Sequence, residues 1–457
     1  MQKKVSRRQF ITQAMHWSAI TGLAPLLSRC TTLDSFFAQD TNYYENEVLI
    51  LGAGAAGLSA AFTLKKKNKP YRVFEASHRP GGRVWTLSPT SDNPNPIELG
   101  AQQILSDHEV AVQLAKELGL YLREKKIEFA LEWKEKLVGL KEVRQSIGPL
   151  IAELKKNQIN LINQDDDQMT IQDLLNQLKL RLSRDQVLIF QQYVISQYGS
   201  QFQHQSANWV LQQIDFDSDE LFFAPRTRWQ IYGGIGELIN TMYERVAGTI
   251  PGQLVKTQHQ LTAIRQRLNY FELDFQTPQG KKTYWARNVI CALPLTALRQ
   301  VQGIDQIEFS DARKKWIHEL GYSQTQVLAG YQNSLVAENF HLSESFQTVS
   351  EQSSIRFIGE AIGQNKSEFK SQINQRYKIS EQQFLDYEFV DWSKQKFIQG
   401  AKSFLQPGHM NLITGLQKYD EFNGHFLFCG EHCSELFSGT VNGAIETGIV
   451  AALKLSS

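Results

Sequence analysis

The chain has 457 residues, of which 42% are hydrophobic and 21% are charged, and its formal net charge at pH 7 is +1. This length and apolar content allow two or three domains with sizeable cores. The near-neutral charge argues against a nucleic acid as the main partner, and four cysteines are too few for a disulfide scaffold.

Residues 1–45 have the pattern of an export signal followed by a linker. Arg7 and Arg8 lie in a run close to the twin-arginine pattern, and the moderately apolar stretch 14–27 is too short and too polar for a transmembrane helix. We therefore expect export in folded form, by the twin-arginine machinery, to the periplasm or beyond. A basic amphipathic arm is the alternative. A lipid anchor at Cys30 is a less favoured possibility, because a small residue is expected just before such a cysteine and Arg29 stands there.

A strand, a glycine-rich turn and a helix follow one another from 47 to 62. Four apolar residues, 48–51, are typical of a strand buried on both faces, and the spacing G-x-G-x-x-G comes next. In this order the glycines permit a tight turn, the approach of a pyrophosphate and close helix packing, and the helix N-terminus favours phosphate. The residues predicted to hold the phosphates are Gly52, Gly54, Ala55, Ala56 and Gly57.

Two further features follow at the expected distance along the sequence. The next strand, 71–74, ends at Glu75, about 20 residues after the glycines, where the fingerprint places the group that binds a ribose hydroxyl. A surface glutamate is the plainer alternative. The run 79–83 then sets two glycines between arginines, so its backbone can lie against a phosphate while Arg83 adds charge-assisted hydrogen bonds.

The end of the chain carries a second signal of the same kind. An apolar strand, 426–428, leads to Gly430 and Glu431, and a helix pattern begins near Thr440. The N-terminus of such a helix favours negative charge. A strand and helix that only pack would be the simpler explanation.

Together these segments resemble the two-dinucleotide-binding-domain flavoproteins, in particular the flavin-containing amine oxidase family of monoamine, polyamine and amino-acid oxidases. The resemblance implies an α/β fold in which a Rossmann-like FAD-binding domain is interleaved with an α+β substrate domain. A nicotinamide enzyme fits less well, because the Gly-Gly arginine run and the closing Gly-Glu have no role there. The residues expected to contact FAD are Gly52, Gly54, Ala55, Ala56, Gly57, Glu75, Ala76, Gly82, Arg83, Gly100, Ala101, Leu261, Gly430, Glu431, Thr440 and Val441.

The expected division of the chain alternates between the two domains. Segments 46–101, 221–294 and 392–457 should form the FAD-binding domain, while 102–220 (helical) and 295–391 (a sheet) should form the substrate domain. Helical periodicity supports this over 110–118, 171–178, 187–198 and 312–320, and strand patterns occur at 254–256, 260–264, 270–275, 288–294, 326–331 and 355–358.

In the resembled family an uncharged amine gives up a hydride to flavin N5, the imine hydrolyses, and dioxygen reoxidises the flavin with release of hydrogen peroxide. We therefore expect an exported FAD-dependent oxidoreductase that acts on an amine or amino acid. A desaturase or dehydrogenase for a non-amine substrate, or a flavin-binding protein with little turnover, are the alternatives. The expected partners are a small-molecule substrate, dioxygen, the export machinery and a second copy of the chain in a homodimer.

Several positions depart from the family pattern. Gln326 stands where many members have a lysine that holds a water near N5, and glutamine brings no positive charge. Lys402 and Thr440 stand where amine-selective members flank the substrate with two aromatic rings, and Lys402 would repel a cationic substrate and attract an anion. Ala401 replaces the cysteine of covalently flavinylated members, so FAD should be non-covalent. Trp392 either walls the pocket or is a core side chain.

Two other groups of residues have competing interpretations. In one interpretation Arg226 and Arg228 bind an anionic substrate, and in the plainer one they lie at the surface or beside a phosphate. Cys429 and Cys433 are spaced C-x-x-x-C beside His432, yet no second ligand pair exists, so no metal site is expected.

Overall fold

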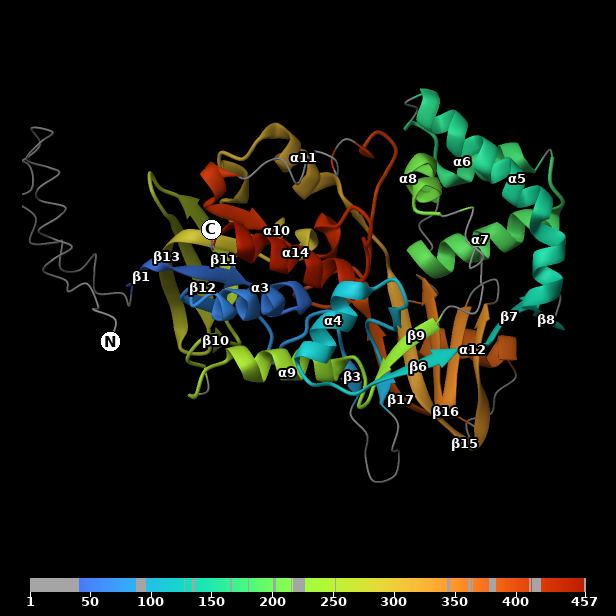
Figure 1. Ribbon diagram of the computed structural model, residues 1–457, viewed down its shortest axis with the longest axis horizontal. Helices are drawn as coiled ribbons and strands as arrows, with labels where there is room; N and C mark the ends of the chain where they lie inside the picture. The colour runs from blue at the N-terminus through green and yellow to red at the C-terminus, as the bar shows by residue number, and fades with distance from the viewer. Residues whose placement is uncertain are drawn as a thin grey trace, which may run out of the picture.

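The computed structural model describes residues 41–87, 96–126, 128–133, 136–164, 167–179, 181–199, 203–214, 216, 227–250, 252–342, 346–360, 363, 365–377, 384–410, 412 and 421–455. These residues form an elongated molecule with two halves (Figure 1). One half contains a mostly parallel sheet covered by helices, and the other contains a second sheet and a lobe of helices. Residues 1–40, which carry the predicted export signal and Cys30, and Arg226 lie outside the described residues.

A seven-stranded sheet forms the first half. Its order is β10-β2-β1-β13-β12-β11, with β19 also pairing with β13, and β1, β2, β13 and β19 run parallel. The strands come from three separate stretches of the chain, which hold β1 and β2, β10 to β13, and β19. Segments that are far apart in the sequence therefore build one sheet. The strands are β1 (Thr41–Leu51), β2 (Tyr71–Phe74), β10 (Val255–Lys256), β11 (Gln260–Gln266), β12 (Phe271–Thr277), β13 (Gly280–Cys291) and β19 (Phe426–Phe428).

The first and last helices of this half lie side by side across the sheet (Figure 1). They are α3 (Ala55–Lys66) and α14 (Val441–Lys454). A Cβ atom at Gly448 would lie only 2.2 Å from the carbonyl oxygen of Ala56, so the absent side chain is what lets the two backbones touch. The Ser59 hydroxyl also donates to the carbonyl oxygen of Ile445, at 3.1 Å. The remaining helices of this half are α4 (Glu109–Glu117), α9 (Gly236–Val246), α10 (Leu295–Leu298) and α11 (Asp311–Glu319).

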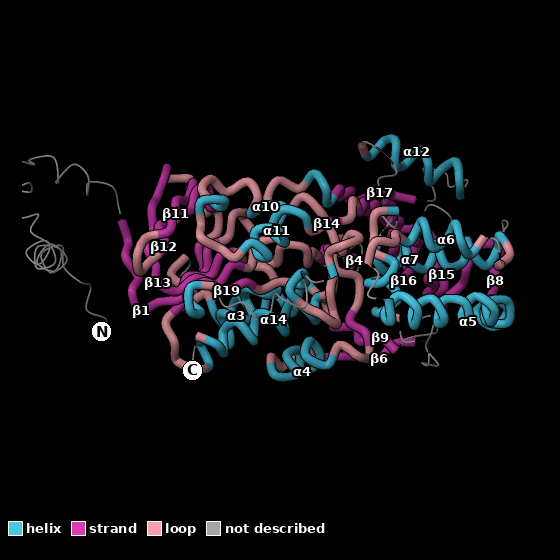
Figure 2. The backbone as a smooth tube through the Cα atoms, turned by 90° about the horizontal axis from the view of Figure 1, so that it is seen from above, coloured by secondary structure: helices cyan, strands magenta, loops and turns pink. Residues whose placement is uncertain are grey.

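The second half combines a five-stranded sheet with helices. Its strands follow the order β16-β15-β7-β8, with β17 also pairing with β15, and α5 to α8 form a lobe beside them (Figures 1 and 2). The elements are β7 (Glu128–Trp133), β8 (Lys136–Gly139), α5 (Leu140–Gln164), α6 (Ile171–Leu178), α7 (Arg184–Tyr198), α8 (Ala207–Gln212), β15 (Thr325–Leu342), β16 (Phe346–Glu360), α12 (Lys366–Tyr377) and β17 (Phe384–Asp391).

Short strands connect the two halves. They form one three-stranded sheet, β5-β9-β6, and two strand pairs, β3-β4 and β14-β18. Their bounds are β3 (Thr86–Leu87), β4 (Ile97–Glu98), β5 (Ile104–Leu105), β6 (Leu122–Lys126), β9 (Thr227–Ile231), β14 (Gly321–Tyr322) and β18 (Ser403–Phe404).

The segment 102–220, which was predicted to be helical, contains strands as well as helices. Helices α4, α6 and α7 confirm the periodicity read from the sequence, but β5 to β8 lie in the same segment and β7 joins the substrate sheet through β15. The sequence of β7, EFALEW, has its large apolar residues Phe129, Leu131 and Trp133 at every second position, which is the period of a strand. Helix α5 was not predicted, and it contains Pro149 in its interior.

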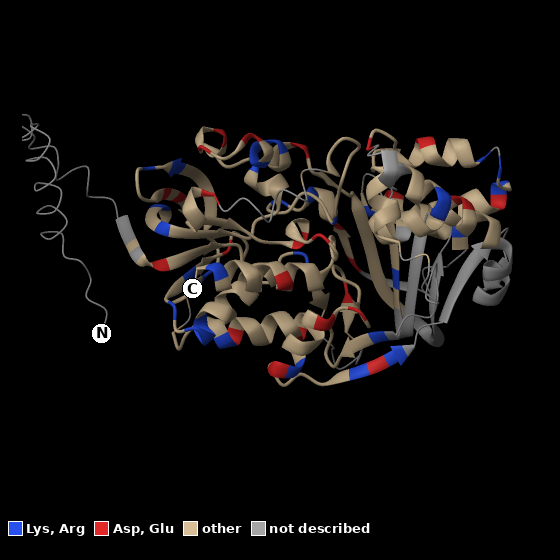
Figure 3. Cartoon of the chain, turned by 45° about the horizontal axis from the view of Figure 1, so that its top comes forward, with Lys and Arg blue, Asp and Glu red and all other residues tan. Residues whose placement is uncertain are grey.

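Acidic and basic side chains are interspersed over the described parts of both halves (Figure 3). Among the described helices, none combines the length and the hydropathy that crossing a bilayer requires. The described residues also include no group of three His, Cys, Asp or Glu side chains that could hold a metal ion. Cys291, Cys429 and Cys433 are buried free thiols, and burial raises the pKa of Cys291 to about 12.

Candidate cofactor and substrate site

The glycine-rich turn between β1 and α3 has the geometry that a dinucleotide needs. Gly52 has φ +101°, and a Cβ atom at Gly57 would lie 1.9 Å from the carbonyl oxygen of Gly52, so only glycine allows α3 to start this close to the strand. A Cβ atom at Gly54 would meet nothing closer than 4.0 Å, which leaves this backbone open to a ligand. The first turn of α3 has no acidic residue, and its N-cap, Gly54, has no side chain that could cap the helix. The N–H groups at Ala55 and Ala56 are therefore suited to a phosphate.

Glu75 lies at the end of β2, next to this turn. Its carboxylate accepts a hydrogen bond from the Ala53 N–H at 2.8 Å, and from the N–H and the hydroxyl of Ser77, both at 2.8 Å. The His259 N–H donates to the carbonyl oxygen of Glu75 at 2.8 Å. Glu75 is therefore a fixed, buried acid at the place predicted for the ribose, and not the surface glutamate of the alternative.

The Gly-Gly turn packs directly against the first glycine turn. The Gly81 N–H donates to the carbonyl oxygen of Ala53 at 2.8 Å, and a Cβ atom at Gly82 would lie 3.6 Å from the Cα atom of Gly54. Arg79 supports this turn: its guanidinium donates to the carbonyl oxygen of Gly82 at 2.9 Å and stacks over the Trp85 ring at 4.5 Å. The two predicted phosphate-binding segments thus form one surface.

Arg83 joins the early part of the chain to its end. Its Nη1 atom lies 2.6 Å from Oε1 of Glu431 and 2.7 Å from the carbonyl oxygen of Ala401. The guanidinium also lies over the Tyr322 ring, 5.7 Å from its centroid. Burial opposes both charges, yet their attraction raises the pKa of Arg83 and lowers the pKa of Glu431. The predicted phosphate contact of Arg83 stays a prediction, whereas its bond to Glu431 is a feature that the sequence did not reveal.

The other oxygen of Glu431 is equally well bound. Oε2 accepts from the Ser403 hydroxyl at 2.6 Å and from the Gly439 N–H at 2.7 Å. Gly430, with φ +145°, turns the chain into this position, and its N–H donates to the Thr447 hydroxyl at 3.0 Å. Glu431 therefore connects β18 and the start of α14 to Arg83. Ser403 was missed because no motif marks it.

Helix α14 begins at this junction. Thr440 is its N-cap: its hydroxyl oxygen accepts from the Gly443 N–H at 3.1 Å and donates to the carbonyl oxygen of Phe437 at 2.7 Å. Val441 is the first helical residue and is buried. The structure thus gives Thr440 a folding role, and its catalytic role stays a prediction.

Lys402 lies across Gly439, next to the same helix start. A Cβ atom at Gly439 would be 3.5 Å from the Cβ atom of Lys402. The Lys402 Nζ donates to the carbonyl oxygen of Gln197 at 2.9 Å, and its backbone N–H donates to the Ser323 hydroxyl at 3.1 Å. Lys402 therefore lies against the residue that precedes Thr440, and the substrate-flanking roles predicted for Lys402 and Thr440 stay predictions.

Gln326 is engaged on all sides by protein. Its Nε2 donates to Oδ2 of Asp391 at 2.9 Å and to the carbonyl oxygen of Gly363 at 2.6 Å, and its Oε1 accepts from the Gly363 N–H at 3.2 Å. Burial opposes the charge of Asp391, but bonds from Ser393, Gln326 and Lys394 lower its pKa. A water held by Gln326 would have to compete with these partners, so this role stays a prediction.

Trp392 supports the site from behind. Only 2% of it is exposed, and its Nε1 donates to the carbonyl oxygen of Leu99 at 3.0 Å. Gly100 lies between Trp392 and the carbonyl oxygen of Arg83. A Cβ atom added at Gly100 would be 3.1 Å from the Trp392 ring and 1.9 Å from that oxygen. The Ala101 N–H donates to that oxygen at 3.1 Å. Of the two interpretations of Trp392, the structure therefore favours the core side chain. Trp392 packs behind residues 99–101 and does not line an open pocket.

The structure shows where three further candidates lie. Leu261 is buried in β11 opposite Phe275, and Ala76 is half-buried beside Glu75, so their contacts to FAD stay predictions. Arg228 lines a cavity of about 40 Å³ together with Gln102, Gln103, Lys125 and Arg356.

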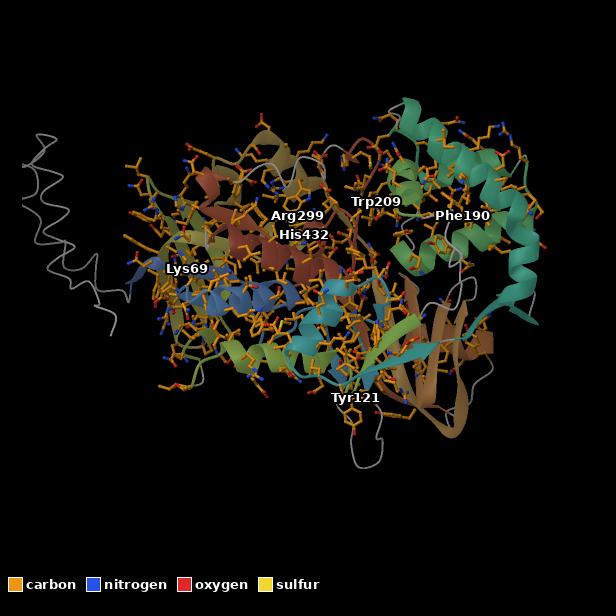
Figure 4. All side chains as sticks on the ribbon, in the orientation of Figure 1. Lys69, Tyr121, Phe190, Trp209, Arg299 and His432 are labelled. Atoms are coloured by element: carbon orange, nitrogen blue, oxygen red, sulfur yellow. The ribbon has the colours of Figure 1, made fainter. Side chains whose placement is uncertain are left out.

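His432, labelled in Figure 4, is buried behind Glu431 and packs against Trp316 with ring centroids 5.3 Å apart. Burial lowers its pKa from 6.5 to about 4, although Glu431 opposes this shift. Because the unfolded chain binds this proton more tightly, stability should fall as the pH drops below about 6.5. Between pH 7 and pH 4.5 the unfolding free energy of the wild-type protein should therefore fall by about 2–3 kcal/mol more than that of His432→Phe. Urea titrations at both pH values measure this, and parallel profiles for both proteins would contradict it.

These features together define a dinucleotide-binding flavoprotein fold whose cofactor cradle is completed by the last helix. Comparison with known proteins agrees. The chain matches the family described as flavin containing amine oxidoreductase over residues 55–339 and 366–455, and it belongs to that family. Membership in this family implies a flavin, FAD, as the cofactor.

Similar proteins include enzymes for both amino acids and amines. An L-amino-acid oxidase of Pseudechis australis is 24% identical over 272 residues, covering 55% of this chain and 52% of the relative. The flavin-dependent L-tryptophan oxidase RebO of Lentzea aerocolonigenes is 25% identical over 308 residues, covering 59% and 63%. The chain thus spans between about half and two thirds of the curated relatives it matches.

Solved structures share the fold. Putrescine oxidase bound to putrescine superimposes with a TM-score of 0.73 at 15% identity, covering 90% of this chain and 99% of that one. Cyclohexylamine oxidase from Brevibacterium oxydans gives 0.72 at 16% identity, covering 90% and 99%. The α/β fold expected from the sequence is confirmed.

Proposed function

We propose that the protein oxidises the carbon–nitrogen bond of an amine or amino acid, with dioxygen as the acceptor and hydrogen peroxide as a product. Bound FAD would supply the hydride acceptor. The observation that carries this proposal is the cradle in which Arg83 and Glu431 hold the early glycine turns against the start of α14. The named relatives act on compounds of these two classes.

The chain's own residues would orient and shield the reactants. The N-termini of α3 and α14 would offer N–H groups to negative charge, α3 to the phosphates and α14 to the flavin. Glu431 is held as a carboxylate, so it can accept hydrogen bonds from the sugar part of the cofactor. Lys402 stands between the halves, where a substrate would enter.

The decisive test is anaerobic bleaching of the flavin absorbance with a panel of amines, polyamines and amino acids. One class should bleach the holoprotein, and air should restore the colour with one peroxide per turnover. If no member of the panel bleaches the flavin, oxidation of carbon–nitrogen bonds is ruled out for these compounds.

We also propose that FAD is bound non-covalently, after which the folded protein is exported. Ala401 has no atom that could form a thioether, and its carbonyl oxygen is already bound by Arg83. Denaturation in acid should therefore release all FAD into the supernatant. Fractionation should find the protein outside the cytoplasm, and replacing Arg7 and Arg8 with lysine should retain it inside.

A flavin-binding protein with little turnover is the second candidate. It is favoured by Gln326, whose amide is bound by Asp391 and Gly363. Gln326→Lys would place an ammonium opposite the Asp391 carboxylate, and we expect the reoxidation rate of the reduced protein by dioxygen to change several-fold. Stopped-flow absorbance measures this rate, with Lys315→Met as a surface control. An unaltered rate would place Gln326 away from the reacting part of the flavin.

A further inference from the structure

A cavity of about 660 Å³ lies beside the β14-β18 strand pair, and none of the residues expected to contact FAD lines it. Its walls come from α10, from the end of α11 with the residues that follow it, and from two later segments within 393–399 and 406–409. Tyr322 borders both places, because it lines the cavity while the Arg83 guanidinium lies over its ring. A volume of this size is ordinary for a site that holds a small molecule. The cavity is therefore a candidate ligand site in addition to the cofactor cradle.

Arg299, labelled in Figure 4, brings a positive charge to this cavity. Its Nε and Nη2 atoms donate to the carbonyl oxygens of Ile317 and Leu320, at 2.5 Å and 2.6 Å, which holds the guanidinium at the end of α11. Its third nitrogen, Nη1, makes no hydrogen bond to a described residue and is not among the enclosed polar atoms of the described residues. Burial lowers the pKa of Arg299, and the described groups that oppose this shift include no carboxylate. Within the described part of the chain, only uncharged groups therefore contact this guanidinium.

The acids and histidines of the cavity are paired with each other. Glu319 lies 2.8 Å from Nε2 of His409, and Nε2 of His318 lies 2.7 Å from a carboxylate oxygen of Asp305. An anion that enters the cavity would therefore meet Arg299 without displacing an acid from it. Charge-assisted hydrogen bonds to a guanidinium are among the strong hydrogen bonds of proteins.

Much of the remaining polar lining consists of amides and hydroxyls. The side-chain amides of Gln324 and Gln406 make no hydrogen bond to the residues that the structure describes. The Thr296 hydroxyl donates to the carbonyl oxygen of Ile398, which leaves its oxygen as an acceptor. A side-chain amide offers two donors and an acceptor in one plane. Such groups suit a ligand with several hydroxyls, which also donate and accept, better than an apolar ligand.

From these observations we propose that the cavity binds a small anion that carries several hydroxyl groups. Arg299 binds the anionic group, and Gln324, Gln406 and Thr296 bind the hydroxyls. Two kinds of molecule have this chemistry, sugar phosphates and sugar acids such as glucuronate. The inference goes beyond the proposed oxidation because it concerns a second site, and it does not depend on which substrate reduces the flavin.

Isothermal titration calorimetry on the FAD-loaded, full-length protein tests this site, because FAD then fills the predicted phosphate-binding turns. The three anionic ligands are glucose 6-phosphate, ribose 5-phosphate and glucuronate, while glucose and inorganic phosphate each carry only one half of the chemistry. At least one anionic ligand should bind about tenfold or more tightly than both glucose and inorganic phosphate. A preference for the two phosphates or for glucuronate identifies the source of the anionic group.

Substitutions in the cavity separate the two halves of the interaction. Arg299→Met should weaken the preferred anionic ligand about 10- to 100-fold and leave the weak binding of glucose nearly unchanged, because a charge-assisted bond is lost. Arg299→Lys, which keeps a positive charge, should retain more affinity than Arg299→Met. Gln324→Ala and Gln406→Ala should each weaken the anionic ligand about 3- to 10-fold. The control Lys67→Met removes a positive charge from the exposed end of α3 and should behave as the wild type.

Arg299 also holds the end of α11, so flavin absorbance and urea unfolding have to show that Arg299→Met is folded. If it is not folded, the two glutamine variants decide, and unchanged affinity in both would overturn the inference. Absence of binding by all three anionic ligands, equal affinity for glucose or for inorganic phosphate, or wild-type affinity in a folded Arg299→Met would each overturn it as well. Bleaching of the flavin by amines or amino acids is a separate result, so the proposed function stands or falls independently.

Discussion

Replacing Gly57 with alanine is expected to give a protein that cannot retain FAD. The added Cβ atom would lie 1.9 Å from the carbonyl oxygen of Gly52, a backbone atom that cannot rotate away. Helix α3 would have to move off β1, which would carry its N-terminal N–H groups away from the phosphates. The purified variant should be colourless, with a flavin-to-protein absorbance ratio below about one tenth of wild type. The free energy of unfolding should also fall by about 2 kcal/mol or more.

Gly148→Ala is the matched control. Gly148 lies in α5, and a Cβ atom there would meet nothing within 4 Å. Alanine favours a helix over glycine by about 0.5–1 kcal/mol, so this variant should be yellow and slightly more stable. A yellow Gly57→Ala protein would show that the glycine turn does not hold the cofactor.

Glu431→Ala is expected to have the second large effect. It would leave the Arg83 guanidinium without its carboxylate and remove the acceptor for Ser403 and Gly439. Breaking a buried pair on one side costs about 3–5 kcal/mol, although the part-exposed Arg83 brings the expected loss toward the lower figure. Urea unfolding should show this loss in the protein without FAD, and FAD should dissociate at least about tenfold more readily.

The pH dependence gives an independent check of this pair. Because the pKa of Glu431 in the folded state lies below its ordinary value of 4.5, its stabilisation is present above pH 4.5 and is lost as the pH falls through the folded pKa. Glu431→Ala should remove this loss in acid. Glu153→Ala, which breaks the more exposed pair with Arg181, should change stability by less than about 1 kcal/mol at any pH. Equal effects of the two variants would contradict a special role for Glu431.

The local features of this site could be read from the sequence, and the distant contacts could not. Gly52, Gly57 and Glu75 lie within one strand–turn–helix–strand unit, whose spacing fixes their geometry. Arg83 and Ser403, by contrast, meet Glu431 across long stretches of chain, and either residue type is common at a surface. The spacing of glycines and arginines therefore predicted that Arg83 binds a phosphate. Only the fold shows that a second anion, the Glu431 carboxylate, lies within hydrogen-bond distance of Arg83.

The same limit explains the errors in the substrate half. Strand β7 is stabilised by pairing with β15, about 200 residues later, and its own sequence is too short to outweigh the surrounding helical patterns. Gln326 aligned with the family position, yet its partners Asp391 and Gly363 come from other elements. The helix predictions succeeded where apolar residues recur on one face, as Ile171, Leu174, Leu175 and Leu178 do in α6.

The position of α14 constrains how the protein is made. This helix is the last described element of the chain, and it contributes the N-cap and the Gly439 N–H that complete the cradle. A growing polypeptide on the ribosome therefore lacks this wall until α14 has been synthesised, and termination before residue 440 removes the N-cap and the helix that follows it. Capture of FAD would accordingly report that synthesis has passed α14.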